Sequence, residues 1–86
     1  MPVYEILLSK AARKQLASLP VFIHNKIIEE ISALSSSPRP SRCKKLKGYK
    51  SAWRIRVGDY RVIYEIEEKT LRVLIIAIGH RKNIYE

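Results

Sequence analysis

The chain is poor in the residues that build metal centres, disulfides and phosphate-binding loops. It has one cysteine, Cys43, and two histidines, His24 and His80, whose separation along the chain does not match a zinc motif. A single cysteine also excludes an intrachain disulfide. The three glycines are isolated from one another, so the sequence contains no glycine-rich phosphate loop. We therefore expect neither a metal nor an organic cofactor.

Long hydrophobic runs are missing too. The longest covers residues 73–78, far short of the roughly 20 apolar residues that a membrane helix needs. Residues 1–10 lack the basic stretch and the small-residue cleavage site of a secretory signal. These absences predict a cytoplasmic protein that does not insert into a membrane.

Negative charge is scarce. The chain has 8 Asp and Glu residues against 17 Lys and Arg residues, a formal net charge of +9. No acidic residue lies between Ile31 and Gly58, where the basic residues are Arg39, Arg42, Lys44, Lys45, Lys47, Lys50, Arg54 and Arg56. Charge of this density favours a polyanionic partner. A basic stretch of this kind is typical of a nucleic-acid-binding surface.

The sequence also lacks signatures of catalysis by carboxylates or by an activated nucleophile. Glu67 and Glu68 are expected in one turn and Asp59 in another, so no carboxylate pair for acid–base or two-metal nuclease chemistry is predicted. Neither Cys43 nor any serine has the local signature of a hydrolase nucleophile.

The length of 86 residues suits one domain with a single core. Residues 3–8 predict a strand, and Ser9 is a good N-cap for a helix over residues 10–19. Pro20 ends this helix and suits the start of a second one that extends to about residue 34. The second helix has an apolar stripe at helical spacing, formed by Ile23, Ile27, Ile31 and Leu34.

Three further strands are predicted after the Ser- and Pro-rich connection at residues 35–41, over residues 52–57, 60–66 and 71–78. Strands grouped after helices favour an α+β fold. We expect residues 1–86 to form one domain with an N-terminal strand, a two-helix hairpin and then a three-stranded antiparallel meander. The helices should pack on one face of the sheet.

The segment WRIRVGDYRVIY, residues 53–64, predicts a hairpin with a type II′ turn at Gly58 and Asp59. In this register one side of the hairpin is apolar or aromatic and is expected in the core. The other side places Arg56 opposite Arg61, with Arg54 two residues along. Opposed like charges destabilise a sheet by up to ~1 kcal/mol, so folding does not require them. The alternative to a functional role is a solvated face whose arginine stems cover apolar surface.

The turn EEKT predicts the register of the last two strands. It places Glu65 opposite Arg72 and Tyr64 opposite Val73, both favourable cross-strand pairs. The arginine side of the sheet is then the face without helices. The apolar residues that this register adds to that face are Leu74, Ile76 and Ile78.

The tail GHRKNIYE adds His80, Arg81 and Tyr85 to the arginines of the hairpin. Metal-free RNA cleavage uses the 2′-hydroxyl as an internal nucleophile, and it needs proton transfer and stabilisation of charge on the phosphate. An aromatic ring can hold an unstacked base. These residue types therefore suit RNA, although His80 could equally be a polar residue at a sheet end and Tyr85 could pack the tail.

The motifs KKLKG, WRIRVGDYRVIYEI and IAIGHRKNIY resemble, in order and spacing, the RelE/ParE superfamily of toxins from bacterial and archaeal type II toxin-antitoxin modules. The resemblance covers nearly the whole chain and is greatest for the RelE branch, ribosome-dependent endoribonucleases that cut mRNA in the ribosomal A site. It implies a RelE-like fold, inhibition of translation by metal-free 2′-hydroxyl attack on mRNA, and two partners. These are a cognate acidic antitoxin and the ribosome with mRNA in its A site.

The resemblance also implies roles for individual residues. Arg54 and Arg56 match the two basic strand residues of the RelE site, and Arg61 matches its phosphate-binding arginine. Arg81 matches the proposed general acid, and Tyr85 the aromatic contact to the codon. We expect further RNA contacts from Lys44, Lys45, Lys47 and Lys50.

One departure concerns the general base. The RelE pattern has lysines where this chain has Arg54 and Arg56, and one of those lysines is the proposed base. Arginine does not readily lose its proton at neutral pH. His80 is the expected substitute, because histidine is the side chain that commonly exchanges protons near neutrality.

Two alternatives to the ribonuclease stay open. ParE-type toxins share the fold but bind DNA gyrase without nuclease activity, and they generally lack the full basic triad with the terminal tyrosine. A basic RNA-binding module without catalysis is the other alternative, since arginines bind phosphate whether or not a bond breaks.

Overall fold

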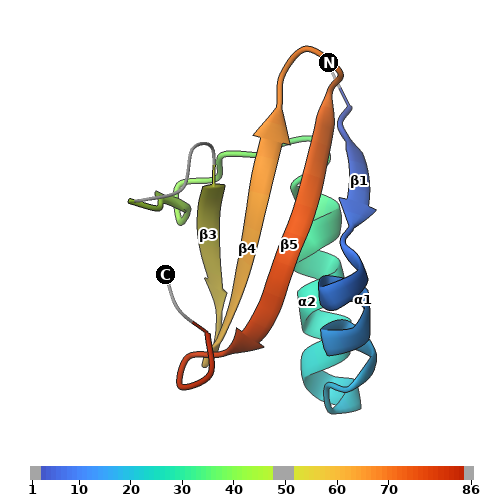
Figure 1. The fold of residues 1–86 in the computed structure, drawn as a ribbon, viewed down its shortest axis with the longest axis vertical. Coiled ribbons are helices and arrows are strands. Elements are labelled where there is room, and N and C mark those ends of the chain that lie inside the picture. The colour runs from blue at the N-terminus through green and yellow to red at the C-terminus, as the bar shows by residue number, and fades with distance from the viewer. Residues whose placement is uncertain (1–2, 48–51, 85–86) are drawn as a thin grey trace.

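The computed structural model describes residues 3–47 and 52–84, and it has the predicted α+β architecture with two helices on one side of a sheet (Figure 1). The sheet has five strands in the order β1-β5-β4-β3-β2. Along the chain the elements are β1 (Glu5–Leu8), α1 (Lys10–Ala17), α2 (Val21–Ala33), β2 (Lys44–Lys45), β3 (Ala52–Val57), β4 (Tyr60–Glu67) and β5 (Arg72–His80).

The predicted meander of β3, β4 and β5 is confirmed, but the sheet extends beyond it on both sides. β1 pairs in parallel with β5, and β2 pairs antiparallel with β3. The sheet is therefore mixed rather than purely antiparallel. The sequence did not predict β2, because a two-residue strand has no periodicity to recognise.

Ser9 connects β1, α1 and β5. Its Oγ accepts a hydrogen bond from the Ala12 amide at 3.0 Å, which confirms the predicted N-cap. The same hydroxyl donates to the Ile76 carbonyl at 2.8 Å, and the Ser9 amide donates to the Ile75 carbonyl at 2.9 Å. One residue thus starts the helix and also satisfies the edge of β5 beyond the point where β1 ends.

The main core lies between the helices and one face of the sheet. The predicted stripe of α2 faces this core, with Ile27, Ile31 and Leu34 buried and Ile23 partly buried. The sheet contributes its apolar face, whose buried members are Ile55, Val57, Val62, Tyr64, Ile66, Val73, Ile75 and Ile78. Neither helix of the described residues is long and apolar enough to cross a membrane.

The β3–β4 hairpin has the predicted register, with Val57 opposite Tyr60 and Arg56 opposite Arg61. Gly58 has φ 61°, which the first central position of a type II′ turn requires and which a residue with a side chain adopts only with strain. The arginine-bearing face points away from the helices, as the alternation of strand side chains predicts.

The predicted register of β4 with β5 is wrong by two residues near the turn. Glu65 lies opposite Leu74 and Tyr64 opposite Ile75. The reason is that β4 continues to Glu67, so the connection to β5 is tighter than the predicted one.

A β-bulge at Ile76 changes which face the rest of β5 presents. The pairing passes from Tyr64–Ile75 directly to Ile63–Ala77. A bulge adds one residue to one strand, so side chains beyond it exchange faces. Leu74 and Ile76 lie on the arginine face as predicted, but the prediction for Ile78 is wrong because this residue faces the main core.

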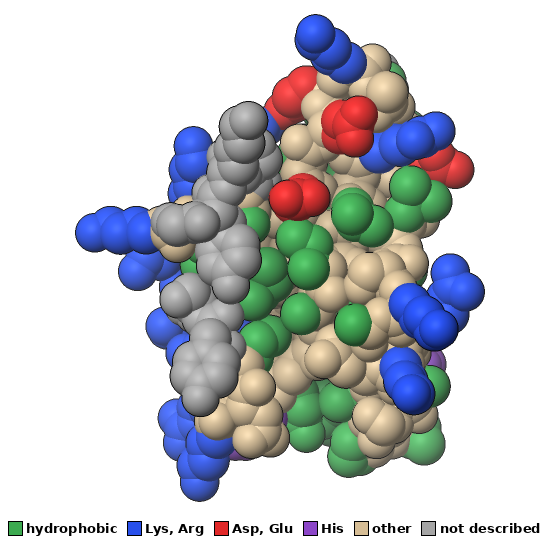
Figure 2. All heavy atoms as spheres, viewed as in Figure 1, with side chains coloured by type: hydrophobic (Ala, Val, Ile, Leu, Met, Phe, Trp, Pro, Cys, Tyr) green, Lys and Arg blue, Asp and Glu red, His purple; other side chains and the backbone are tan. Residues whose placement is uncertain are grey.

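The face away from the helices, which we call the open face, has a small apolar cluster of its own. Leu46, Ala52 and Ile63 are buried there, against Ile76 and Ala77. Figure 2 shows apolar side chains over β4 and β5 on this face, acidic side chains toward its upper end, and basic ones at the top and along both margins. The open face thus has an apolar centre bordered by charged side chains.

Candidate nucleic-acid interface

The end of the sheet at the β3–β4 turn brings together Arg56, Arg61 and Arg81. Arg56 lies opposite Arg61, which in turn lies opposite Gly79, two residues before Arg81. The three arginines line a cavity of about 110 Å³, which we call the cationic cavity. Its other lining residues are Gly58, Asp59 and Tyr60. Two strands and the segment after β5 thus bring together three of the predicted site residues.

The β3–β4 turn fixes the position of Arg81. The Arg81 amide donates to the Asp59 carbonyl at 2.8 Å, and Arg81 Nη1 lies 4.0 Å from Asp59 Oδ1. Both side chains are exposed, so the ion pair contributes little to stability, about 0 to 1 kcal/mol. The backbone hydrogen bond therefore ties the segment after β5 to the β3–β4 turn.

The predicted arginines differ in their access to solvent. Arg56 and Arg81 are exposed and Arg61 is partly buried, whereas Arg54 is only 5% exposed. Arg54 shares the open face with Arg56 through the alternation of β3. It therefore adds positive charge from within the sheet, where the lower dielectric strengthens its field.

The predicted lysines lie beside this cluster. Lys44 is opposite Arg54 and so shares the open face, and Lys45 is opposite Trp53. Both lysines are exposed and, with Leu46 and the exposed Lys47, line a shallow cavity of about 270 Å³. The predicted RNA contacts at Lys50 and Tyr85 lie outside the described residues.

His80 occupies the other face of the sheet. It lies opposite Tyr60 at the end of β5, on the side that faces the helices, whereas Arg61 points to the open face. Its Nδ1 accepts a hydrogen bond from the Lys82 amide at 3.2 Å. An amide can only donate, so Nδ1 is the acceptor in this bond and Nε2 is the ring nitrogen that can donate. The structure does not bring this ring together with the arginines.

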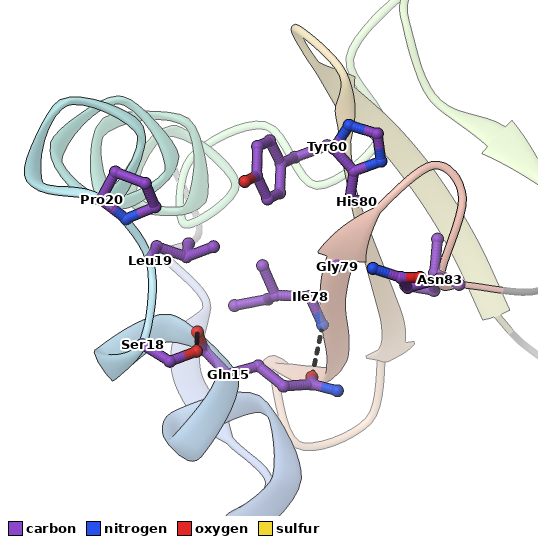
Figure 3. A pocket seen from close by; sticks show the side chains of 10 residues that line it. Gln15, Ser18, Leu19, Pro20, Tyr60, Ile78, Gly79, His80 and Asn83 are labelled. Atoms are coloured by element: carbon purple, nitrogen blue, oxygen red, sulfur yellow. Dashed lines mark hydrogen bonds between the residues drawn. The ribbon is translucent and has the colours of Figure 1, made fainter.

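A larger cavity of about 320 Å³ lies on the helix-facing side of this sheet end (Figure 3). It is bordered by the C-terminal part of α1, the connection to α2, and the ends of β4 and β5. The rings of Tyr60 and His80 meet edge to face, with centroids 5.3 Å apart and planes at 83°. Gln15 Oε1 accepts a hydrogen bond from the Ile78 amide at 2.8 Å and so joins α1 to β5.

The sequence did not predict this cavity, which we call the neutral cavity. Its residues come from separate segments, and the apolar run of β5 continues through the bulge without any visible break. The Gly58-Asp59 turn motif was the one feature of the sequence that could have indicated this cavity, because it locates the start of β4. No group of three or more His, Cys, Asp or Glu side chains suited to a metal ion occurs within residues 3–47 and 52–84.

Comparisons with known proteins give one consistent relationship. A family model described as "ParE toxin of type II toxin-antitoxin system, parDE" matches residues 6–85. The chain is 35% identical to Toxin RelE3 of Methanocaldococcus jannaschii over 86 residues, which cover 95% of this chain and 96% of that protein. It is 33% identical to Toxin RelG of Mycobacterium tuberculosis over 87 residues, with 95% of each chain covered.

The fold agrees with these relationships. A chain of the archaeal RelE-RelB complex from Pyrococcus horikoshii OT3 superposes with a TM-score of 0.82 at 30% identity, covering 95% of this chain and 99% of that one. The helices, the sheet and the position of the arginine-bearing hairpin are therefore features of a shared fold rather than of this sequence alone.

Proposed function

Because the chain belongs to the RelE/ParE superfamily of type II toxins, we propose that it is an mRNA endoribonuclease that acts on the ribosome and inhibits translation. The supporting observation is the gathering of Arg56, Arg61 and Arg81 around the cationic cavity on the open face. Folding does not require these charges, because like charges that face each other on paired strands destabilise the sheet. A bound phosphodiester would bring a negative charge to this cluster.

The arginines suit the chemistry of RNA cleavage. The 2′-hydroxyl loses its proton to a base and its oxygen attacks the phosphorus. The bond to the 5′-oxygen then breaks and this oxygen takes up a proton from water, so the products are a 2′,3′-cyclic phosphate and a 5′-hydroxyl. Arg56 and Arg61 stabilise the negative charge that builds on the phosphate oxygens, because guanidinium groups bind phosphate with paired N–H donors. One preorganised contact of this kind contributes about 100- to 1,000-fold in rate.

We assign Arg81, the third arginine of the cationic cavity, to stabilisation of the leaving 5′-oxygen. The proton of the 2′-hydroxyl needs an acceptor. His80 is the acceptor expected from sequence, but it would have to reach around the end of the sheet from the helix-facing side. We therefore assign charge stabilisation to this chain and proton removal to a group that the ribosome supplies.

A cognate antitoxin is the second proposed partner. Relatives of this chain were solved as toxin-antitoxin complexes, the archaeal RelE-RelB complex and the RelBE2 complex of Mycobacterium tuberculosis. The net charge of +9 favours an acidic antitoxin. A disordered acidic segment that folds on binding can cover a large basic surface and associate rapidly at low salt.

The family model is described as a ParE toxin, which favours gyrase binding as the second candidate function. A gyrase-binding toxin does not need an arginine cluster arranged for phosphate chemistry. The two functions therefore differ in what Arg61→Ala removes: the variant would lose mRNA cleavage in the first case and keep toxicity in the second.

The test is brief expression in cells, followed by mapping of new 5′ ends on mRNA. We expect cuts within codons in the reading frame, and their loss in Arg61→Ala. Arg13→Ala is the matched control, since Arg13 is an exposed arginine on α1, away from the cluster. Intact mRNA with DNA damage would support gyrase binding instead.

A further inference from the structure

We propose that the neutral cavity binds a nucleobase of the RNA whose phosphate occupies the cationic cavity. This inference rests on the proposed function, because it names the part of the substrate that a second cavity at the same sheet end would hold. It concerns the helix-facing side of the sheet, where His80 is the predicted site residue that lines the cavity.

The two cavities differ in charge. The described lining of the neutral cavity contains no Lys, Arg, Asp or Glu, whereas three arginines line the cationic cavity. A phosphate in the neutral cavity would lose hydration without gaining a cation, which is unfavourable. A nucleobase is uncharged and planar, with polar edges and apolar faces. The apolar surfaces of Leu19 and Ile78 and the polar groups of Ser18 and Asn83 match such a ligand.

The aromatic pair in the cavity suits a planar ring. Tyr60 and His80 are partly buried and nearly perpendicular, so a base in contact with both lies face to one ring and edge to the other. Unstacked bases are commonly held on aromatic side chains of this kind. Because His80 Nδ1 is the acceptor of a hydrogen bond, Nε2 is the ring nitrogen that can donate to a base carbonyl or ring nitrogen.

The cavities are close enough to share a wall. Tyr60 lines both of them. In addition, the aromatic residues are the chain neighbours of the cations, Tyr60 next to Arg61 and His80 next to Arg81. In the proposed arrangement the nucleotide crosses the end of the β4–β5 pair, with its phosphate on the open face and its base on the helix-facing side.

The experiment titrates the ¹⁵N-labelled full chain with the four nucleoside 5′-monophosphates and, separately, with ribose 5-phosphate. We expect both kinds of ligand to shift the resonances of Arg61 and Arg81. Only the nucleotides should shift the amides of Ser18, Leu19 and Asn83, because only they carry a base.

Two variants test the cavity itself. Ser18→Trp should fill it from the exposed end of α1, and His80→Ala should remove one of its rings. Each should weaken nucleotide binding by about 5- to 100-fold, the range expected for loss of a base–aromatic contact, and leave ribose 5-phosphate binding unchanged. Ser32→Trp on the exposed side of α2 is the matched control. Thermal melts of all three variants verify folding.

Identical shifts with nucleotides and ribose 5-phosphate would overturn the nucleobase site, as would unchanged nucleotide binding in both folded cavity variants. These outcomes are separate from failure of the proposed function, which is read from the 5′ ends of mRNA in cells. Base-dependent shifts without mRNA cuts would leave the nucleobase site standing and refute the ribonuclease.

Discussion

Arg56 on β3 lies directly opposite Arg61 on β4, near the end of a hairpin whose other face is buried in the core. This arrangement places two positive charges where strand pairing alone favours opposite charges or apolar residues. Arg81 adds a third charge after β5. The strand register thus places Arg56 and Arg61 side by side, an arrangement that suits the phosphate role proposed above.

Arg56→Gln should stabilise the free protein by up to ~1 kcal/mol, because it removes the repulsion and keeps most of the stem that covers the sheet. Urea unfolding at low and high salt measures this. The gain should shrink at high salt, since salt screens exposed charges. A variant that is less stable than the wild type at low salt would show that Arg56 has a structural role.

Arg61→Ala and Arg81→Ala should each reduce mRNA cleavage by about 100- to 1,000-fold without loss of fold, because each removes one preorganised contact to the reacting phosphate. Single-turnover cleavage on programmed ribosomes gives the rates, and circular dichroism melts report the fold. Arg13→Ala should cleave like the wild type. If the two cluster variants melt well below the Arg13 variant, the arginines support the fold rather than the reaction.

His80→Gln should keep the pH profile of cleavage from about pH 5.5 to 8.5, because its ring lies on the other face of the sheet from Arg61. What should change is the preference for the base next to the cut. The measurement is single-turnover cleavage over this pH range on several codons. Loss of the rise in rate with pH would instead identify His80 as the proton acceptor that the sequence predicts.

Glu68 should make the protein more stable at neutral pH than at acid pH. The Tyr4 hydroxyl donates to Glu68 Oε2 at 2.6 Å, Arg39 pairs with the same carboxylate, and together they hold the pKa of Glu68 below its ordinary value of 4.5. A carboxylate with a lowered pKa in the folded state stabilises the fold above its unfolded pKa, and this stability is lost as the pH falls through the lowered value.

The measurement is the melting temperature between about pH 7 and pH 3 for wild type and Glu68→Gln. The melting temperature of the wild type should fall more on acidification than that of Glu68→Gln, because the glutamine has no proton to take up. Tyr4→Phe removes only the hydroxyl and should lessen the acid sensitivity in part. The hydrogen bond to Glu68 raises the pKa of the Tyr4 hydroxyl, and burial of the hydroxyl raises it further. The stability that this hydroxyl contributes is therefore lost as the pH rises above 10. Equal acid sensitivity in wild type and Glu68→Gln would contradict the assignment.

Local patterns in the sequence determined the elements and the arginine hairpin. Ser9 and Pro20 mark helix starts through short-range backbone chemistry, and the two-residue turn at Gly58 and Asp59 sets the pairing of Arg56 with Arg61. These features depend on neighbours within a few residues. A sequence contains that information directly.

The tertiary structure alone decided how distant segments meet. The parallel pairing of β1 with β5, the short strand β2 and the bulge at Ile76 depend on long-range contacts that leave no periodic signal. One inserted residue exchanges the faces of all later side chains in β5, so it placed Ile78 in the core and His80 beside Tyr60, away from the arginines. The face on which His80 lies was therefore set by the register of the whole sheet, and no short stretch of sequence could specify it.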